Sequence, residues 1–227
     1  MNARIRTLVR TPWFWGLVGI VLLLAINTIK DPTYLAIGIN PTTGLLAGNV
    51  LDILRVSSPI IMIALGMTFV IATSGIDLSV GSIMAVGGAV AMVTLSEIGQ
   101  AESFGAMAAA IGLAVLLGAV LGSINGLLVS VVGLQPFIST LVMMLAARGI
   151  ARVITGGQNT NATNGPFKQI ANGQFFGLPI SFVVAIALVI IVALIMRRTA
   201  LGLMIEAIGI NPRASRLAGI RPKPILI

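Results

Sequence analysis

Asp77 is the side chain with the clearest capacity for chemistry, because it interrupts two apolar segments that are joined with almost no polar spacer. A charged side chain at membrane depth is costly and is a functional candidate by default. Gly75 and Gly81 flank it, with Ser79 between them, and these glycines permit a broken helix or a re-entrant turn. The alternative is that Asp77 caps the following helix by accepting from free backbone N–H groups. We favour the cap over direct contact with a substrate, although the two roles are compatible.

Asn125 lies beside a row of small residues, Gly118, Gly122 and Gly126, at four-residue spacing. Small residues on one helix face let a neighbouring helix approach closely. The Asn125 amide can hydrogen-bond that neighbour. We therefore expect helix packing here, with a ligand role as the lesser alternative.

Arg148 and Arg152 are four residues apart and share one face of a predicted helix. Arginines near the end of a membrane helix extend toward the interface or form ion pairs, and Glu97 and Glu102 are the acidic residues nearest in the predicted topology. Contact with an external partner or a gate is the alternative, which we favour less.

Several kinds of chemistry are excluded by residue type. The chain has no cysteine and no histidine, which removes disulfides, Cys/His metal sites and histidine proton transfer. No lysine follows a glycine, and no two glycines are spaced as G-x-G, so the phosphate-binding and dinucleotide-binding motifs are absent. We expect no cofactor, no metal and no catalytic residue. Any nucleotide-driven work falls to another chain.

Membrane-spanning helices are the elements that must position these candidates. The 227 residues are 57% hydrophobic and 9% charged, with a mean hydropathy of +1.08, whereas soluble domains carry about 25% charged residues. Lengths near about 20 residues suit a helix that crosses the hydrocarbon core. The predicted fold class is all-α, a polytopic bundle of about six helices with a break near Gly75–Gly81. The six apolar segments are residues 13–29, 53–73, 78–95, 105–132, 137–154 and 178–196.

The basic residues predict the orientation. The net charge of +8 could suggest nucleic acid, but Lys and Arg gather at the two ends of the chain, beside apolar segments. This bias predicts a cytoplasmic N-terminus, with residues 157–177 outside and residues 199–223 inside. A signal peptide is the alternative for the first segment, but no small-x-small cleavage site follows it, and Trp13 and Trp15 resemble an interfacial belt.

Residues 199–220 form a mildly amphipathic stretch that this topology places in the cytoplasm. A short helix with Ala and Ile on one side and Glu and Arg on the other suits a partner's groove. Adsorption to acidic lipid is the alternative. The chain then ends in Pro-Ile-Leu-Ile, which is typical of the start of a seventh helix. We therefore expect residues 1–227 to be a single transmembrane domain that is incomplete at its C-terminus and does not function alone.

Three stretches resemble the permease subunits of ribose-type and galactofuranose-type sugar ABC importers. They are GMTFVIATSGIDLSVGSIMAVGG at residues 66–88, NGLLVSVVGLQPFISTLVMMLAARGIARVITGG at residues 125–157 and TALGLMIEAIGINPRASRLAGI at residues 199–220. Within that family, the sequence of these stretches is more similar to galactofuranose-type permeases than to ribose-type ones. The Asn-rich residues 159–172 have no counterpart that we can match.

The resemblance implies a pore of two permease subunits, an ATP-hydrolysing subunit beneath each and a periplasmic sugar-binding protein above. It identifies residues 199–223 as the coupling segment that seats on the ATPase, through Leu203, Glu206, Ala207, Gly209, Asn211, Arg213, Ala214 and Gly219. The pathway or helix break would contain Gly75, Asp77, Ser79, Gly81 and Asn125. Alternating access would then import a monosaccharide. The alternatives are an ion-coupled secondary transporter, for which Asp77 is the single buried-carboxylate candidate, and an inactive remnant.

Overall fold

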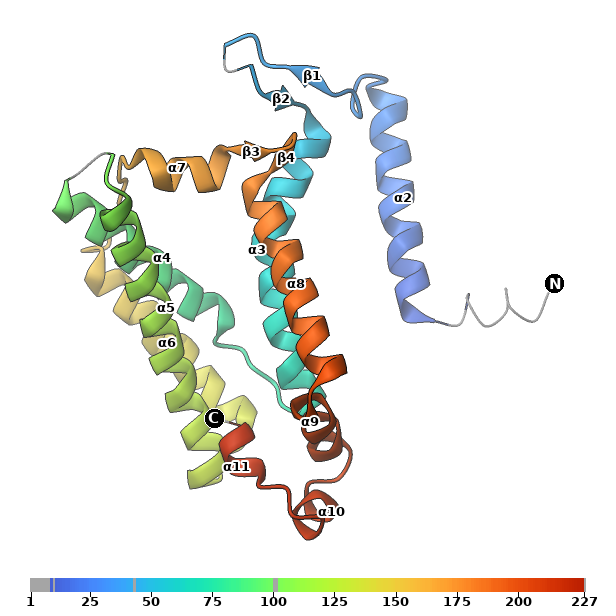
Figure 1. Ribbon diagram of the computed structural model, residues 1–227, viewed down its shortest axis with the longest axis vertical. Helices are drawn as coiled ribbons and strands as arrows, with labels where there is room; N and C mark the ends of the chain where they lie inside the picture. Colours follow the sequence, from blue (N-terminus) through green and yellow to red (C-terminus); the bar gives the residue numbers. More distant parts are fainter. Residues whose placement is uncertain (1–8, 10, 43, 100–101, 227) are drawn as a thin grey trace. The chain divides into compact units, whose positions relative to one another are not determined.

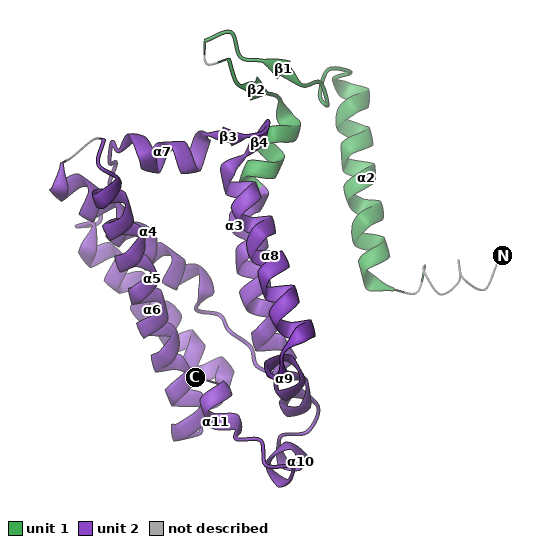
Figure 2. Ribbon diagram, viewed as in Figure 1, with its two compact units in different colours: residues 1–56 green, residues 57–227 purple. Residues whose placement is uncertain are grey.

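The computed structural model describes residues 9, 11–42, 44–99 and 102–226. It divides into two compact units, residues 1–56 and 57–227 (Figure 2). The helix α3 (Asn49–Ala72) contains the boundary between them. Each unit is described by itself.

Unit 1 contains a membrane-length helix and a small hairpin. The helix α2 (Pro12–Lys30) begins with a proline, which fits the first helical turn because no intrahelical partner exists there for its missing N–H. The strands β1 (Gly38–Ile39) and β2 (Leu46–Ala47) pair antiparallel. Gly48 follows with a φ of +148°, and a Cβ there would collide with the Ala36 carbonyl. A glycine is therefore required where the hairpin enters α3.

The loop after α2 is shaped by short side chains that bond their own backbone. Thr33 donates to Asp31 Oδ1 through its backbone N–H at 2.9 Å and its hydroxyl at 2.6 Å. The Thr33 hydroxyl and N–H hold the pKa of the Asp31 carboxyl below its ordinary value. Thr42 makes the same pair of bonds to Asn40 Oδ1. The first of these turns follows the end of α2, and the second lies between β1 and β2.

Unit 2 continues α3 and is almost entirely helical (Figure 1). Its further elements are α4 (Val80–Ile98), α5 (Phe104–Leu127), the π-helical turn η1 (Leu128–Val132), α6 (Pro136–Ile154), α7 (Gly165–Asn172), β3 (Gln174–Phe175), β4 (Leu178–Pro179), α8 (Ile180–Arg198), α9 (Ala200–Ile210), α10 (Pro212–Leu217) and α11 (Pro222–Ile225).

Six helices among the described residues are long and apolar enough to cross a membrane: α2, α3, α4, α5 with η1, α6 and α8. The prediction of a polytopic helical bundle is confirmed. Boundaries moved by a few residues: α3 begins at Asn49, before the predicted residue 53, and α4 begins at Val80, after the predicted residue 78. The four short strands were not predicted, because each spans only two residues.

The helices α4, α5 and α6 pack together, with α4 against both partners (Figure 1). Alanines make this approach close: Ala91 and Leu95 of α4 are buried with Ala106 and Ala110 of α5. The predicted glycine row contributes less than expected. A Cβ on Gly118 would meet Ile83 at 3.9 Å, and one on Gly122 would meet nothing within 4 Å. Small residues do bring α4 and α5 together, but mainly at alanines rather than at that row.

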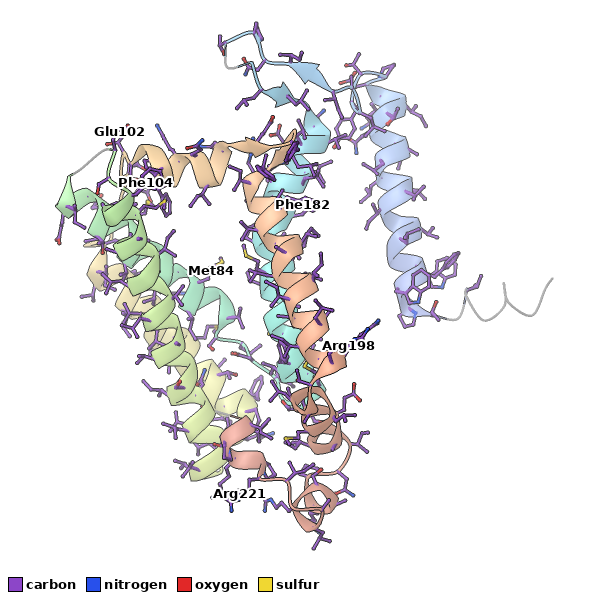
Figure 3. The ribbon with its side chains drawn as sticks, viewed as in Figure 1. Met84, Glu102, Phe104, Phe182, Arg198 and Arg221 are labelled. Carbon is purple, nitrogen blue, oxygen red and sulfur yellow. The ribbon has the colours of Figure 1, made fainter. Side chains whose placement is uncertain are left out.

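The Asn-rich stretch between α6 and α8 contains the short helix α7, which has a side-chain cap at its start. The buried Asn164 caps α7 by accepting from the Phe167 N–H at 2.9 Å, and its amide donates to the Ser103 carbonyl at 3.2 Å. Glu102 lies against Gly165 at the start of α7 (Figure 3). Negative charge is favourable at a helix N-terminus. This part of the Asn-rich stretch is therefore tied to the connection between α4 and α5.

Candidate functional site

The connection between α3 and α4 is the predicted break, and it begins with a defined helix ending. The Gly75 N–H bonds the Val70 carbonyl at 2.8 Å, and the Ser74 N–H bonds the Ile71 carbonyl at 2.9 Å. This pair of bonds is the Schellman ending, whose left-handed position is usually glycine. Here that residue is Ser74, with a φ of +61°. A non-glycine residue in this region costs about 1–3 kcal/mol.

Asp77 organises the other side of the break, though not as the helix cap that was predicted. Its Oδ1 accepts from the backbone N–H of Ser79 at 2.7 Å and from the Ser79 hydroxyl at 2.6 Å. The N-cap of α4 is Ser79, and Asp77 stands two residues before it. The cap prediction is therefore wrong, because α4 begins later than the apolar pattern indicated. Asp77 instead closes a local turn that presents Ser79 to the helices around it.

Ser79 continues into a buried polar chain across three helices. The Asn125 amide of α5 donates to Ser79 Oγ at 2.9 Å, and the Ser139 hydroxyl of α6 donates to Asn125 Oδ1 at 3.1 Å. All three side chains are buried. The prediction that Asn125 bonds a neighbouring helix is confirmed. Buried polar groups need such partners, so the chain fixes the break against α5 and α6.

Thr140 was not predicted as part of the site. Its hydroxyl bonds the Pro136 carbonyl at 2.9 Å, one turn earlier in α6, and reaches the Ile76 carbonyl of the break at 3.3 Å. The signal available in the sequence was the pair Ser139-Thr140 inside an apolar run, directly after Pro136. Two adjacent hydroxyls in such a run favour polar contacts with another segment.

A cavity of about 500 Å³ opens beside the break. Apolar side chains make up most of its wall, while Asp77, Asn125 and Thr140 supply polar groups. Of the predicted pathway residues, Gly75, Asp77 and Asn125 line the cavity. Ser79 is held behind them in the polar chain, and Gly81 lies in the first turn of α4 with open space around it. The segments that meet here are the end of α3, the break, α5, η1, the start of α6, α9 and α11.

The predicted coupling segment is two helices rather than one. Asn211 and Pro212 divide α9 from α10, and Asn211 Oδ1 caps α10 by accepting from the N–H groups of Arg213 and Ala214 at 3.1 and 3.0 Å. Pro212 cannot continue the hydrogen bonds of α9, which explains the division. Gly219 follows α10 with a φ of +86° and ends it.

Several side chains of this segment, apolar ones included, are exposed in the isolated chain. Leu203, Ile210 and Leu217 are 72%, 86% and 91% exposed. Glu206, Arg213 and Ala214 are also exposed, and Ala207 and Gly209 are partly buried. Arg198 at the end of α8 and Arg221 before α11 are exposed as well (Figure 3). A run of apolar side chains rimmed by charges is typical of a binding surface.

Arg148 and Arg152 line a second cavity, of about 600 Å³, between α4 and α6. Residues 158–161, Gln-Asn-Thr-Asn, complete its polar wall. Among the described residues the one ion pair joins Arg55 to Asp52, at 3.3 Å. The expected pairing with Glu97 or Glu102 is therefore not found in that part of the chain. Both arginines are exposed and line this cavity, whose wall mixes polar and apolar residues.

These features define the class of the protein. Six of the described helices are apolar and long enough to span a membrane, and the connection between α3 and α4 is fixed by a buried chain of polar side chains. The chain is therefore a multi-pass membrane protein. The family model described as "Branched-chain amino acid transport system / permease component" matches residues 49–227. The chain belongs to this permease family.

Three relatives are sugar permeases by name. A fructose import permease protein of Bifidobacterium longum is 50% identical, over 99% of this chain and 63% of its own length. A galactofuranose transporter permease protein of Escherichia coli is 36% identical, over 93% and 60%. A ribose import permease protein of Escherichia coli is 36% identical, over 93% and 62%. The chain spans about three-fifths of the length of these relatives. No solved structure matches it.

Proposed function

We propose that the chain is the membrane-spanning permease subunit of a binding-protein-dependent ABC importer that carries a monosaccharide across the bacterial inner membrane. The match of residues 49–227 to a permease family, together with relatives named as sugar import permeases, carries this proposal. The chain is then a transport subunit rather than an enzyme. Fructose is the first sugar to test, since the relative named for it is 50% identical.

The partners follow from this role. A cytoplasmic ATP-binding subunit would seat on residues 199–223, whose exposed Leu203 and Ile210 support a protein partner rather than solvent. A periplasmic sugar-binding protein would dock on the opposite side, and a second permease subunit, identical or different, would complete the pore. Residues 1–227 would belong to one permease domain.

The sugar's path would pass the break between α3 and α4. The cavity beside Asp77 and Asn125 supports this assignment, because its polar groups are fixed in a mostly apolar wall. Such a combination is usual for small-molecule sites. On this proposal the pore alternates between inward-open and outward-open states as ATP binds to and leaves the partner. Asp77 then serves the shape of the path more than the choice of sugar.

Uptake by the native host tests the proposal. Deleting the gene is expected to reduce uptake of radiolabelled fructose, ribose or galactofuranose to background, for at least one of these sugars. Uptake in the undeleted strain should stop when ATP is depleted and survive a protonophore that leaves ATP intact. Uptake that collapses with the protonophore while ATP is maintained would instead identify an ion-coupled secondary transporter.

Single cysteines test the orientation, because the chain has no native cysteine to interfere. Asn159 and Arg213 are both exposed, so each can be replaced by Cys without disturbing the interior. A membrane-impermeant maleimide is expected to label Asn159→Cys in intact spheroplasts and Arg213→Cys only after permeabilisation, as the Lys and Arg bias predicts. The reverse pattern would invert the topology and move residues 199–223 outside.

A further inference from the structure

The end of α3 touches α9 through the residue with the unusual backbone. Ser74 occupies the left-handed position of the helix ending, and its hydroxyl donates to the Gly209 carbonyl of α9 at 3.1 Å. The two residues are 135 positions apart in the sequence. Glycine would fit this backbone without strain, and it would lack the hydroxyl. Serine at this position has a backbone cost that glycine would avoid, so we infer that the hydrogen bond from its hydroxyl has a function.

The backbones of α3 and α9 are also in direct contact at this point. A Cβ on Gly209 would collide with the Ala72 carbonyl at the end of α3, and a Cβ on Gly202 would collide with the Met196 carbonyl of α8. These two glycines are seven residues apart, so they share one face of α9. At these two points α9 meets the backbone at the ends of α3 and α8 with no side chain between them.

The connection between α3 and α4 begins directly after the residues of α3 that contact Gly209. Asp77 lies three residues beyond Ser74 and leads through Ser79 to Asn125 and Ser139. A continuous series of hydrogen bonds and one short backbone segment therefore connects α9 to the end of α5 and the start of α6. Among the described residues, Ser74 is the single side chain that joins residues 199–223 to the break by a hydrogen bond.

We propose that the contact between Ser74 and Gly209 transmits movement of α9 to the break, and that Ser74 is a positioning residue for transport. This inference rests on the proposed function, because it assigns the route by which the ATP-binding partner's movement reaches the sugar's path. The hydrogen bond keeps Ser74 attached to α9 as α9 moves. The close backbone contact at Gly209 passes the displacement of α9 to the end of α3.

The contact is first tested without any partner. Ile76 is exposed and lines the cavity beside the break, so a cysteine there reports the state of the break through its rate of labelling. In purified protein, Ser74→Gly and Gly209→Ala are each expected to change the labelling rate of Ile76→Cys severalfold. Gly66→Ala is the control in α3, since a Cβ at Gly66 meets nothing within 4 Å. An unchanged rate in both test variants would overturn the proposal.

The second arm measures sugar uptake per ATP hydrolysed with the assembled partners. Ser74→Gly removes the backbone strain together with the hydroxyl donor, so the variant should unfold at no lower temperature than the unsubstituted protein. Its sugar uptake per ATP should fall about fivefold to tenfold, which is the low end of the usual coupling between two sites. Ser74→Asn should restore most of it, because Asn tolerates the left-handed region and its amide can donate. Normal uptake per ATP in Ser74→Gly would overturn the proposal. If the importer expressed from the intact gene of the native host shows no ATP-driven uptake, the proposed function fails, and the labelling arm alone decides the contact.

Discussion

Replacing Leu203–Ile220 by a Gly/Ser linker of equal length, in the gene of the native host, is expected to abolish ATP-driven sugar uptake. The linker cannot seat against α3, because the buried Ile205 and Ile208 and the close contact at Gly209 are lost together. It also removes the exposed apolar side chains that we assign to the ATP-binding partner. Membrane insertion should be retained, since all six candidate spans precede this segment. Normal uptake by a well-expressed variant would contradict the coupling assignment.

Crosslinking supplies the matched control for that experiment. Glu206 is exposed and Ile208 is buried, two residues apart in α9. A photoreactive group on Glu206→Cys is expected to capture the ATP-binding subunit, whereas the same group on Ile208→Cys should capture none. Equal capture from both positions would mean that α9 is unfolded or that the contact is nonspecific.

Removing the carboxylate oxygen at position 77 is expected to destabilise the protein, while neutralising its charge is not. Asp77→Asn keeps an Oδ1 that can accept both bonds from Ser79. Asp77→Ala leaves the Ser79 N–H and hydroxyl without that acceptor, which costs about 1–3 kcal/mol for a buried polar group. Thermal unfolding in detergent should therefore place Asp77→Asn near the unsubstituted protein and Asp77→Ala clearly below it. A well-folded Asp77→Asn that loses uptake or changes sugar preference would instead assign the charge to the sugar's path.

Two serine-to-alanine changes provide a control for the same polar chain. Ser139 donates to Asn125, whereas the buried hydroxyl of Ser130 has no partner within the described residues. Ser139→Ala is expected to lower stability by roughly 0.6 kcal/mol and at most about 1.7 kcal/mol, the average and the maximum for hydrogen bonds between membrane helices. Ser130→Ala should cost less, because it removes a hydroxyl that already lacks a bond.

The sequence was sufficient for the parts of this structure that depend on local patterns. Apolar runs predicted all six spans, and the Gly-Ile-Asp-Leu-Ser-Val-Gly sequence located the break. Asn125 was predicted to bond another helix, but its partners were not, because Ser79 lies 46 residues away. The contact between Ser74 and Gly209 spans 135 residues, and only the tertiary structure brings them together. The division at Pro212 could have been predicted, since proline disrupts a helix interior. The coupling and pathway roles of these residues stay predictions.

The unequal lengths of the six spans have a consequence for the membrane around them. Helices α2, α4, α6 and α8 have 19 residues each, whereas α5 with η1 forms a continuous 29-residue span. At about 1.5 Å per residue, a 19-residue helix is about 28 Å long and the longest span about 43 Å. A hydrocarbon core is about 30 Å thick, so four spans fit it nearly upright while α5 must tilt or protrude, and mismatch costs a fraction of a kcal/mol per Å. The acyl chain length of the surrounding lipid therefore acts on α5 more than on its neighbours, and α5 is the helix that holds Asn125.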